Sequence, residues 1–337
     1  MNKKLSSLFE ILHKFRLNNG FYIASTSYDY SYTWLRDNFY CSLPELWNNQ
    51  EFYIQTYQTW LDYYLSIENK YKKFSSLIEK KVIENDWEFP NPRINADLSE
   101  IHTGWNHVQI DQIGYFLYGI AKGESLGLKI IRNSEDIKIM QLCVDMLEAI
   151  DYHLVPESGA WEEGRECPRA STIGVIIAGL IECYHLKSIK IPPLLIQNGR
   201  NALDYILPNE TLSRKYDLAQ LFLIYPFNLL TEKQTLRIIS NVEKNLLKDN
   251  GVIRYKNDKY FNNGFEAEWS FGLSYLGLIY FQLGDIKKSK YYCDKVLENG
   301  YNIPELYFGK TNIPNDNNPL SWSIAITIEL VKKLENI

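Results

Sequence analysis

The 337-residue chain has few cysteines and no motif that would pair them. Its five cysteines are an odd number, are widely spaced and include no Cys-x-x-Cys pair. Disulfide frameworks and structural zinc sites both need closely spaced sets of cysteines, so neither is expected. Buried free thiols in a reducing compartment fit this pattern, and we expect a cytoplasmic protein.

Long apolar runs and an excess of positive charge are also missing. No stretch approaches the roughly 18 apolar residues of a membrane span. Glu10 and His13 interrupt the apolar N-terminus too early for a signal peptide. The net charge is −5 and no basic stripe is visible, which argues against a phosphate backbone as partner. We therefore expect the chain to bind neither membranes nor nucleic acid.

The short signatures of common catalytic sites are absent as well. The sequence contains no glycine-rich phosphate loop, no His-Glu-x-x-His pair and no Gly-x-Ser-x-Gly elbow. Its five histidines show no recognised ligand spacing. We expect neither a metal ion nor a cofactor.

Glycine and proline are scarce, and the apolar pattern is helical. The 18 glycines and 12 prolines are few for a turn-rich all-β protein. Ile173, Ile176, Ile177, Leu180 and Ile181 follow the spacing of one buried helix face. Asp285 is a typical N-cap for the helix that follows it. The pattern predicts twelve helices, near 4–17, 37–48, 51–80, 105–127, 134–153, 169–186, 192–206, 216–230, 232–247, 266–283, 286–299 and 319–335.

The order of helices and loops predicts an all-α fold. No linker or change of composition divides the chain, so we expect one domain over residues 1–337. Twelve helices joined by several long loops suggest an (α/α)6 barrel, in which six inner helices are wrapped by six outer ones. The long loops would gather at one end and form a pocket. Such a chain is expected to be a monomer or a homodimer.

Aromatic residues are the abundant class, at 14% of the chain, and several tryptophans stand beside acids. Trp34 is followed by Arg36 and Asp37 at a predicted helix start. An acid there is favoured by the helix dipole alone. A ring beside an Arg–Asp pair is also how proteins hold a sugar, because the hydroxyls take paired hydrogen bonds while the apolar ring face stacks.

Two further segments combine tryptophan with carboxylates. Trp105 precedes Gln109 and Asp111, which fall at the start of a predicted helix and could simply cap it. Trp161 precedes Glu162 and Glu163 in a loop. Repulsion between adjacent carboxylates and desolvation by the ring both raise a carboxyl pKa, as a general acid requires, although loop glutamates are usually just solvated.

Two segments near the C-terminus complete the set. Glu305 lies in a loop ahead of Trp322, and Arg254 precedes Trp269 at the start of a predicted helix. A lone loop glutamate normally has no role. A glycosidase, however, needs a second carboxylate that faces the first across its pocket, and Glu305 could supply it.

Taken in order, these segments resemble glycoside hydrolase family 15, the glucoamylases, and the related N-terminal region of phosphorylase kinase regulatory subunits. The motifs are YTWLRDN, then Trp-Glu-Glu continuing to RASTIGVIIAGL, then PEL followed by PLSWS. The resemblance extends from Tyr28 to the end of the chain. It implies an (α/α)6 catalytic barrel and an inverting exo-hydrolase that releases β-glucose from non-reducing ends of α-glucans.

The resemblance also implies roles for individual residues. Glu162 matches the general acid and Glu305 the general base that activates water. Arg36 and Asp37 match a clamp on the terminal glucose. The positions expected to bind substrate are Trp34, Arg36, Asp37, Trp105, Gln109, Asp111, Trp161, Glu163, Arg254 and Trp322.

Departures from the family pattern bear on specificity. Asn-His-Val precedes Gln109, where fungal glucoamylases carry Arg-Pro, which affects preference beyond the first glucose. The β-sandwich and the starch-binding module of some relatives are not expected here, so short α-1,4 or α-1,6 gluco-oligosaccharides suit the chain better than starch. The alternative is a non-catalytic glucan-binding barrel like the phosphorylase kinase regulatory subunits. The presence of both Glu162 and Glu305 favours the hydrolase.

Overall fold

The computed structural model describes residues 3–76 and 86–335, and helices dominate it as predicted. The chain forms two compact units. The first unit comprises Met1–Glu45 with Pro208–Ile337, and the second comprises Leu46–Leu207. Among the described residues, no helix combines the length and apolar character that a bilayer crossing needs.

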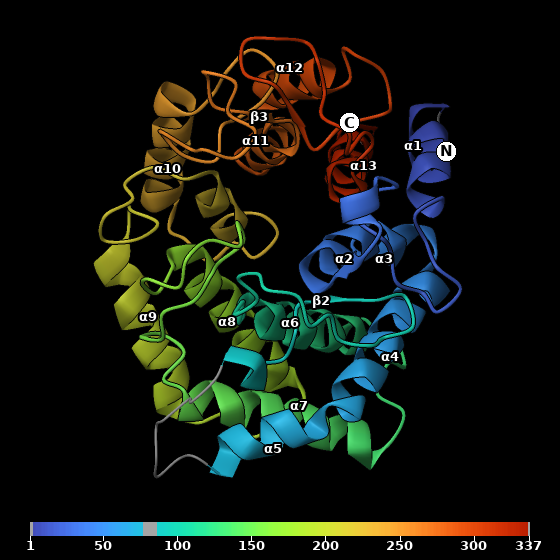
Figure 1. Ribbon diagram of the computed structural model, residues 1–337, viewed down its shortest axis with the longest axis vertical. Helices are drawn as coiled ribbons and strands as arrows, with labels where there is room; N and C mark the ends of the chain where they lie inside the picture. The colour runs from blue at the N-terminus through green and yellow to red at the C-terminus, as the bar shows by residue number, and fades with distance from the viewer. Residues whose placement is uncertain (1–2, 77–85, 336–337) are drawn as a thin grey trace. The chain divides into compact units, whose positions relative to one another are not determined.

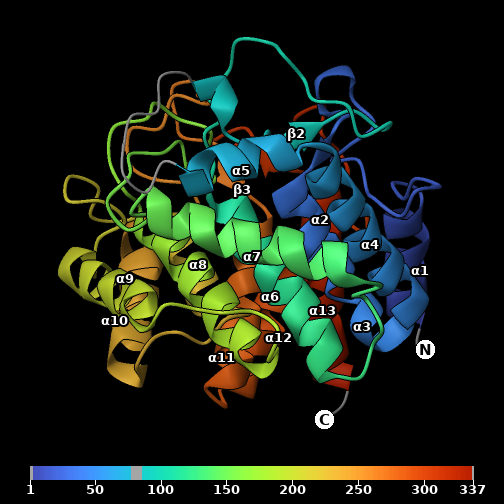
Figure 2. The same cartoon turned by 90° about the horizontal axis from the view of Figure 1, so that it is seen from below.

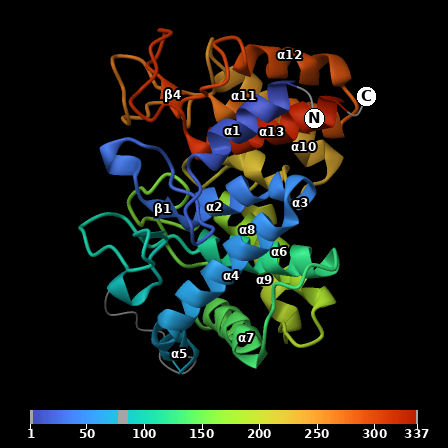
Figure 3. The ribbon, with the colours of Figure 1, turned by 90° about the vertical axis from the view of Figure 1, so that its right-hand side faces the viewer.

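The first unit is built around its last helix, α13 (Ser321–Glu335). Helices from both ends of the chain pack on α13, as Figures 1 and 3 show. They are α1 (Lys3–His13), α2 (Leu35–Ser42), α11 (Phe271–Gln282) and α12 (Ile286–Val296). The remaining elements of this unit are α10 (Glu232–Asn245), the 3-10 helices η1 (Tyr28–Tyr30) and η5 (Leu218–Leu223), and the short strands β1 (Thr33–Trp34), β3 (Glu268–Trp269) and β4 (Leu306–Tyr307).

The helices α11 and α12 form a hairpin whose members differ in character. Helix α11 is apolar and buried from Phe271 to Tyr280. Helix α12 is amphipathic, and Asp285 is its N-cap: its carboxylate accepts a hydrogen bond from the backbone N–H of Lys288 at 3.0 Å. The predicted N-cap role of Asp285 is confirmed. Strands β3 and β4 pair antiparallel beside this hairpin, with Trp269 opposite Leu306.

The second unit packs its helices in pairs, with α6 on α8, α8 on α9 and α5 along α7, as Figure 2 shows for α5 and α7. Gly114 of α6 and Gly179 of α8 let the two backbones approach closely, since a Cβ on Gly179 would lie 2.5 Å from the carbonyl oxygen of Gly114. The elements are α4 (Gln50–Ser66), α5 (Glu68–Ser76), α6 (Asp111–Ser125), α7 (Ser134–Ala149), α8 (Ala170–Glu182), α9 (Pro193–Ile206), η3 (Asp86–Glu88), η4 (Cys183–His185) and β2 (Arg93–Ile94), with α3 (Glu45–Asn48) at the boundary of the two units.

Several predicted helices are shorter than expected. The helix predicted over 51–80 is divided at Ile67, and residues 77–80 lie outside the described part of the chain. The helix predicted over 216–230 is wrong, because only η5 forms there. Pro226 lacks a backbone donor and Asn228 has a left-handed φ of 50°, so an α-helix cannot continue through them.

Two predicted helices begin later than expected. Residues 105–110 are irregular and α6 starts at Asp111; residues 266–270 precede α11, with Glu268 and Trp269 in β3. Both segments carry candidate site residues. The five cysteines are free, as predicted, and four of them are buried.

Candidate active site

The carboxylate of Glu305, in the first unit, is buried and held by three side chains. Glu305 immediately precedes β4 and is 2% exposed. The hydroxyl of Tyr30 donates to its Oε1 at 2.8 Å. The Nδ2 groups of Asn315 and Asn317 donate to its Oε2 at 2.6 and 2.8 Å. Three side-chain donors therefore fix the orientation of this carboxylate.

The same contacts set the protonation behaviour of Glu305. Burial raises the pKa of its carboxyl group, and donation from Asn317, Tyr30 and Asn315 partly offsets that rise. The charge of Arg254 lowers the pKa further. Because the raising effect of burial prevails, this carboxylate is a stronger base than a solvated glutamate. The hydrogen bonds and the charge of Arg254 still stabilise its ionised form.

Sequence reasoning missed the donors to Glu305. Tyr30 also shares a hydrogen bond with the hydroxyl of Tyr260 at 2.6 Å, so the two tyrosines form a chain that ends on Oε1 of Glu305. Ser27 donates to the side-chain carbonyl of Asn317. The sequence offered two weak signals for these donors. Tyr30 lies four residues before Trp34, and Asn315 lies in an asparagine-rich loop.

The predicted clamp residues lie together at the start of α2. Arg36 and Asp37 are in the first turn of α2 and are buried, which confirms their place at a helix start. The ring of Trp34 lies 5.1 Å from that of Tyr30, the residue that donates to Glu305. The guanidinium of Arg36 lies 5.7 Å from the ring centroid of Trp322.

Trp322 is packed on both faces. Its ring stacks on Tyr40 with centroids 4.7 Å apart and on Phe271 at 4.5 Å. Its indole N–H donates to the hydroxyl of Tyr275 at 3.2 Å. Both faces of this ring and its N–H are therefore used in contacts within the first unit, beside Arg36.

Arg254 is anchored by a buried acid. Its Nε and Nη2 donate to the two carboxylate oxygens of Asp258 at 2.6 and 2.7 Å. Its guanidinium also lies 4.6 Å from the ring centroid of Tyr260 and 5.2 Å from that of Trp269. The segment around Arg254 is thereby joined to the tyrosine that reaches Glu305 through Tyr30.

In the second unit, the two predicted segments are joined by hydrogen bonds. The side chain of Asn106 donates to the carbonyl of Glu162 at 3.0 Å, and the backbone N–H of Ser158 donates to the carbonyl of Val108 at 2.7 Å. Gln109 is buried and donates to the carbonyl of Asn106 at 3.2 Å. The segment 105–111 thus supports the turn 159–164.

The other candidates of this unit lie in these two segments. The ring of Trp105 is covered by the guanidinium of Arg93, whose Cζ lies 4.1 Å from the ring centroid. Asp111 is buried at the first position of α6. Trp161 is 8% exposed, directly before the half-buried Glu162.

The turn 159–164 has an unusual backbone. Gly159 and Glu162 both have left-handed φ angles, of 64° and 58°. The N–H of Glu162 donates to the carbonyl of Gly159 at 3.1 Å, and that of Glu163 to the carbonyl of Ser158 at 3.0 Å. The carboxylate of Glu163 pairs with Arg169 at 3.3 Å.

Glu157 is a buried carboxyl group that the sequence did not indicate. It is 1% exposed and accepts hydrogen bonds from the N–H of Gly159 at 2.6 Å and from the hydroxyl of Thr172 at 3.0 Å. Burial raises its pKa to about 8, against the opposing effect of Arg169. The charge of Asp111 contributes to the rise. Glu157 lies five residues before Glu162, outside the Trp-Glu-Glu segment.

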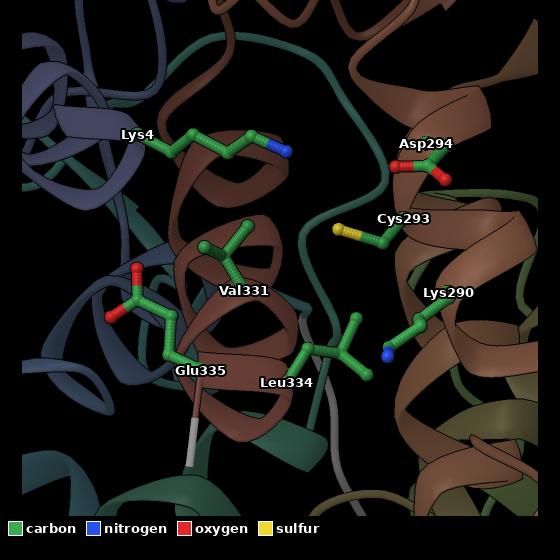
Figure 4. A pocket seen from close by; sticks show the side chains of 7 residues that line it. All are labelled: Lys4, Lys290, Cys293, Asp294, Val331, Leu334 and Glu335. Carbon is green, nitrogen blue, oxygen red and sulfur yellow. The ribbon is translucent and has the colours of Figure 1, made fainter. Parts of the chain in front are cut away.

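A separate pocket of the first unit involves none of these residues. It lies between α1, α12 and α13, and Figure 4 shows Lys4, Cys293 and Val331 facing it. Burial raises the pKa of the Cys293 thiol to about 11, so this cysteine is un-ionised near neutral pH. The pocket is distinct from the candidate active site.

Solved structures share the fold of this chain. A wild-type glycosidase matches with a TM-score of 0.83 at 17% identity, covering 99% of this chain and 96% of that one. Glucoamylase from Saccharomycopsis fibuligera matches at 0.71 and 15% identity, over 99% and 94% of the two chains. A bacterial glucoamylase complexed with acarbose matches at 0.69 and 16% identity, over 99% and 56%. The predicted all-α, (α/α)6 fold is confirmed.

Sequence comparison indicates the family directly. A Caenorhabditis elegans protein described as a probable phosphorylase b kinase regulatory subunit alpha is 25% identical over 174 residues, which are 46% of this chain and 14% of that subunit. The liver isoform of phosphorylase b kinase regulatory subunit alpha from Mus musculus is 26% identical over 174 residues, and the match spans only 14% of that subunit. The model of glycosyl hydrolases family 15 matches residues 10–190, more than half of the chain. The chain therefore belongs to glycosyl hydrolases family 15.

Proposed function

We propose that this protein is an inverting, exo-acting α-glucosidase that releases β-glucose from the non-reducing ends of short α-gluco-oligosaccharides. The observation that carries the proposal is the carboxylate of Glu305, which is buried, held by three side-chain donors and raised in pKa. A binding module has no need for a carboxylate prepared in this way, whereas a general base does.

The proposed mechanism uses two carboxyl groups. Glu162, protonated, donates to the glycosidic oxygen of the leaving sugar. Glu305, ionised, takes a proton from a water molecule that attacks the anomeric carbon from the opposite ring face. Inversion requires the two carboxyl groups to stand roughly 6.5–9.5 Å apart, which leaves room for that water.

The proposed glucose contacts come from the remaining candidates. Arg36 and Asp37 would take paired hydrogen bonds with the hydroxyls of the terminal glucose, and Trp34 would lie beside its ring. Support for a glucose-type ligand comes from relatives: one glycosidase with this fold was solved in complex with glucose, at a TM-score of 0.82 and 17% identity. Short α-1,4- or α-1,6-linked oligosaccharides are the proposed substrates.

The decisive experiment measures glucose release. Purified protein is incubated with maltose, isomaltose, trehalose and maltotriose, and the anomer formed first is identified by proton NMR. We expect release from maltose or isomaltose with β-glucose as the initial product. Initial α-glucose would contradict inversion, and no release from any of these sugars would contradict the hydrolase.

A second candidate function is glucan binding without hydrolysis, favoured by the matches to phosphorylase kinase regulatory subunits. It predicts saturable binding of maltotriose or isomaltose with no turnover. Isothermal titration of the wild-type protein, performed beside the hydrolysis assay, separates the two functions. Under this alternative, the protein would release no glucose, and replacing Glu162 or Glu305 by glutamine would change binding or stability only.

A further inference from the structure

Glu157 and Arg169 form a buried acid–base pair beside the turn 159–164, which carries Glu162. Glu157 is fixed to α8 by the hydroxyl of Thr172 and to the turn by the N–H of Gly159. Arg169 stands at the N-cap position of α8 and is 5% exposed. Its Nε lies 3.5 Å from Oε1 of Glu157. A packed helix and the start of the turn are thereby connected through one carboxylate.

The guanidinium of Arg169 also reaches the end of the turn. Its Nη1 pairs with the carboxylate of Glu163 at 3.3 Å, and its Nη2 donates to the carbonyl of Gly164 at 3.3 Å. The side chain of Arg169 therefore contacts Glu157, which precedes the turn, as well as Glu163 and Gly164 at its end. Glu162 lies in the segment between these attachments.

The backbone of the turn is shaped around this side chain. A Cβ at Gly159 would lie 2.3 Å from Cδ of Arg169 and 2.6 Å from its Nε, so only glycine fits there. The φ of Gly159 is left-handed as well, which again favours glycine. Since Glu162 is also left-handed, the turn depends on surrounding contacts to keep its conformation.

We propose that Glu157 and Arg169 are positioning residues that hold the turn 159–164 and so orient the carboxyl group of Glu162 for proton donation. This inference rests on the proposed role of Glu162 as general acid. Neither residue is assigned a contact with substrate. The charged groups that face the pair are Glu163 and Asp111. Burial of these polar groups carries a desolvation cost that hydrogen bonds must offset, which fits a role in orientation.

The first test measures how the defect depends on the leaving group. Glu157→Gln and Arg169→Lys are compared with wild type on the best oligosaccharide and on α-glucosyl fluoride, whose leaving group needs little protonation. We expect kcat on the oligosaccharide to fall about tenfold or more with KM nearly unchanged, and the alkaline limb of the pH profile to move. The loss on the fluoride should be several-fold smaller. Equal losses on both substrates, or an unmoved alkaline limb, would overturn the inference.

Asp136→Asn provides a matched control. Asp136 is a fully buried acid of the same unit that pairs with Arg132 at 2.9 Å, on α7 rather than beside the turn. Its replacement should lower thermal stability and leave the pH profile and the leaving-group dependence unchanged. A purely structural role for Glu157 predicts the same behaviour for both variants.

The second test does not depend on activity. Amide hydrogen exchange of the segment 158–166 is followed by mass spectrometry in wild type, Glu157→Gln and Asp136→Asn. We expect at least tenfold faster exchange in this segment for Glu157→Gln only, with α6 and α8 unaffected. Unchanged exchange would overturn the inference whatever the activity. A wild type that is inactive on every sugar would overturn the proposed function instead.

Discussion

The two proposed catalytic carboxyl groups are held in different ways. Glu305 is held directly, by three side-chain donors on its own oxygens. The backbone of Glu162 is held by the carbonyl of Gly159, which accepts from its N–H, and by the side chain of Asn106, which donates to its carbonyl. A general base must stay ionised and oriented, so donors on the carboxylate serve it. A general acid must keep its proton until the glycosidic bond breaks, which requires a carboxyl group whose ionised form is not favoured.

The largest expected effect separates the two glutamates by chemistry. Glu162→Gln and Glu305→Gln should each lower kcat on oligosaccharides by about 10²–10⁴-fold, since each removes a proton transfer. On α-glucosyl fluoride, Glu162→Gln should recover most of its activity, whereas Glu305→Gln should not. Steady-state kinetics on both substrates measure this difference. Similar behaviour of the two variants on the fluoride would contradict the assigned roles.

A smaller effect is expected from one donor to Glu305. Tyr30→Phe removes the hydroxyl that donates to Oε1 while keeping the ring beside Trp34. Loss of a hydrogen bond to a charged group should lower kcat roughly tenfold. Tyr28→Phe is the matched control, because Tyr28 is 90% exposed, and it should behave as wild type. Equal activity of the two variants would show that the Tyr30 hydroxyl has no part in the reaction.

Asn315→Ala should change the pH dependence more than the maximal rate. Donation from Asn315 lowers the pKa of the Glu305 carboxyl, so its loss raises that pKa further. The base is then protonated over a wider acidic range, and the acidic limb of kcat/KM moves to higher pH. A pH–rate profile from acid to neutral pH measures the shift. Movement of the limb to lower pH would contradict the assignment of Glu305 as base.

The smallest expected effect concerns stability. The pKa of Glu157 is about 8 in the folded protein, against an ordinary value of 4.5. Between these pH values the folded state holds a proton that the unfolded state releases, so the free energy of unfolding decreases as pH rises. Glu157→Gln should reduce this decrease. Urea unfolding of wild type and variant at pH 5, 6.5 and 8 measures it, and parallel pH dependences would argue against the raised pKa.

The sequence predicted the long helices well because their apolar spacing is regular over several turns. Helices α7, α9 and α10 lie within the predicted ranges. The failures lie in irregular segments, such as residues 105–110 before α6 and the two-residue strand β3. A strand of two residues is too short to show alternation, and its conformation is set by pairing with β4, which lies far along the chain.

The chemical groups of the candidate site were proposed from the sequence, whereas the residues that hold them were not. Each tryptophan–acid segment could be recognised because its residues are adjacent in sequence. The donor Tyr30 lies 275 residues from Glu305, and no local pattern links them. Arg169 could be matched to neither Glu157 nor Glu163 by spacing, because the turn between them reverses the chain. Partners brought together by tertiary structure alone are invisible to local patterns.

The aromatic residues do not divide between core and candidate site by residue type. Trp322, a candidate substrate contact, is sandwiched between Tyr40 and Phe271 and so packs as a core residue does. Tyr30, in contrast, donates to the proposed base. Ring type alone therefore does not tell core from site.

The left-handed backbone of Glu162 has a consequence for engineering. A residue with a Cβ at φ 58° costs about 1 kcal/mol more than glycine would. Selection for heat resistance alone would therefore favour glycine at position 162, which under the proposed role of Glu162 would remove turnover. Libraries that aim at thermostable variants of this chain should keep that position fixed.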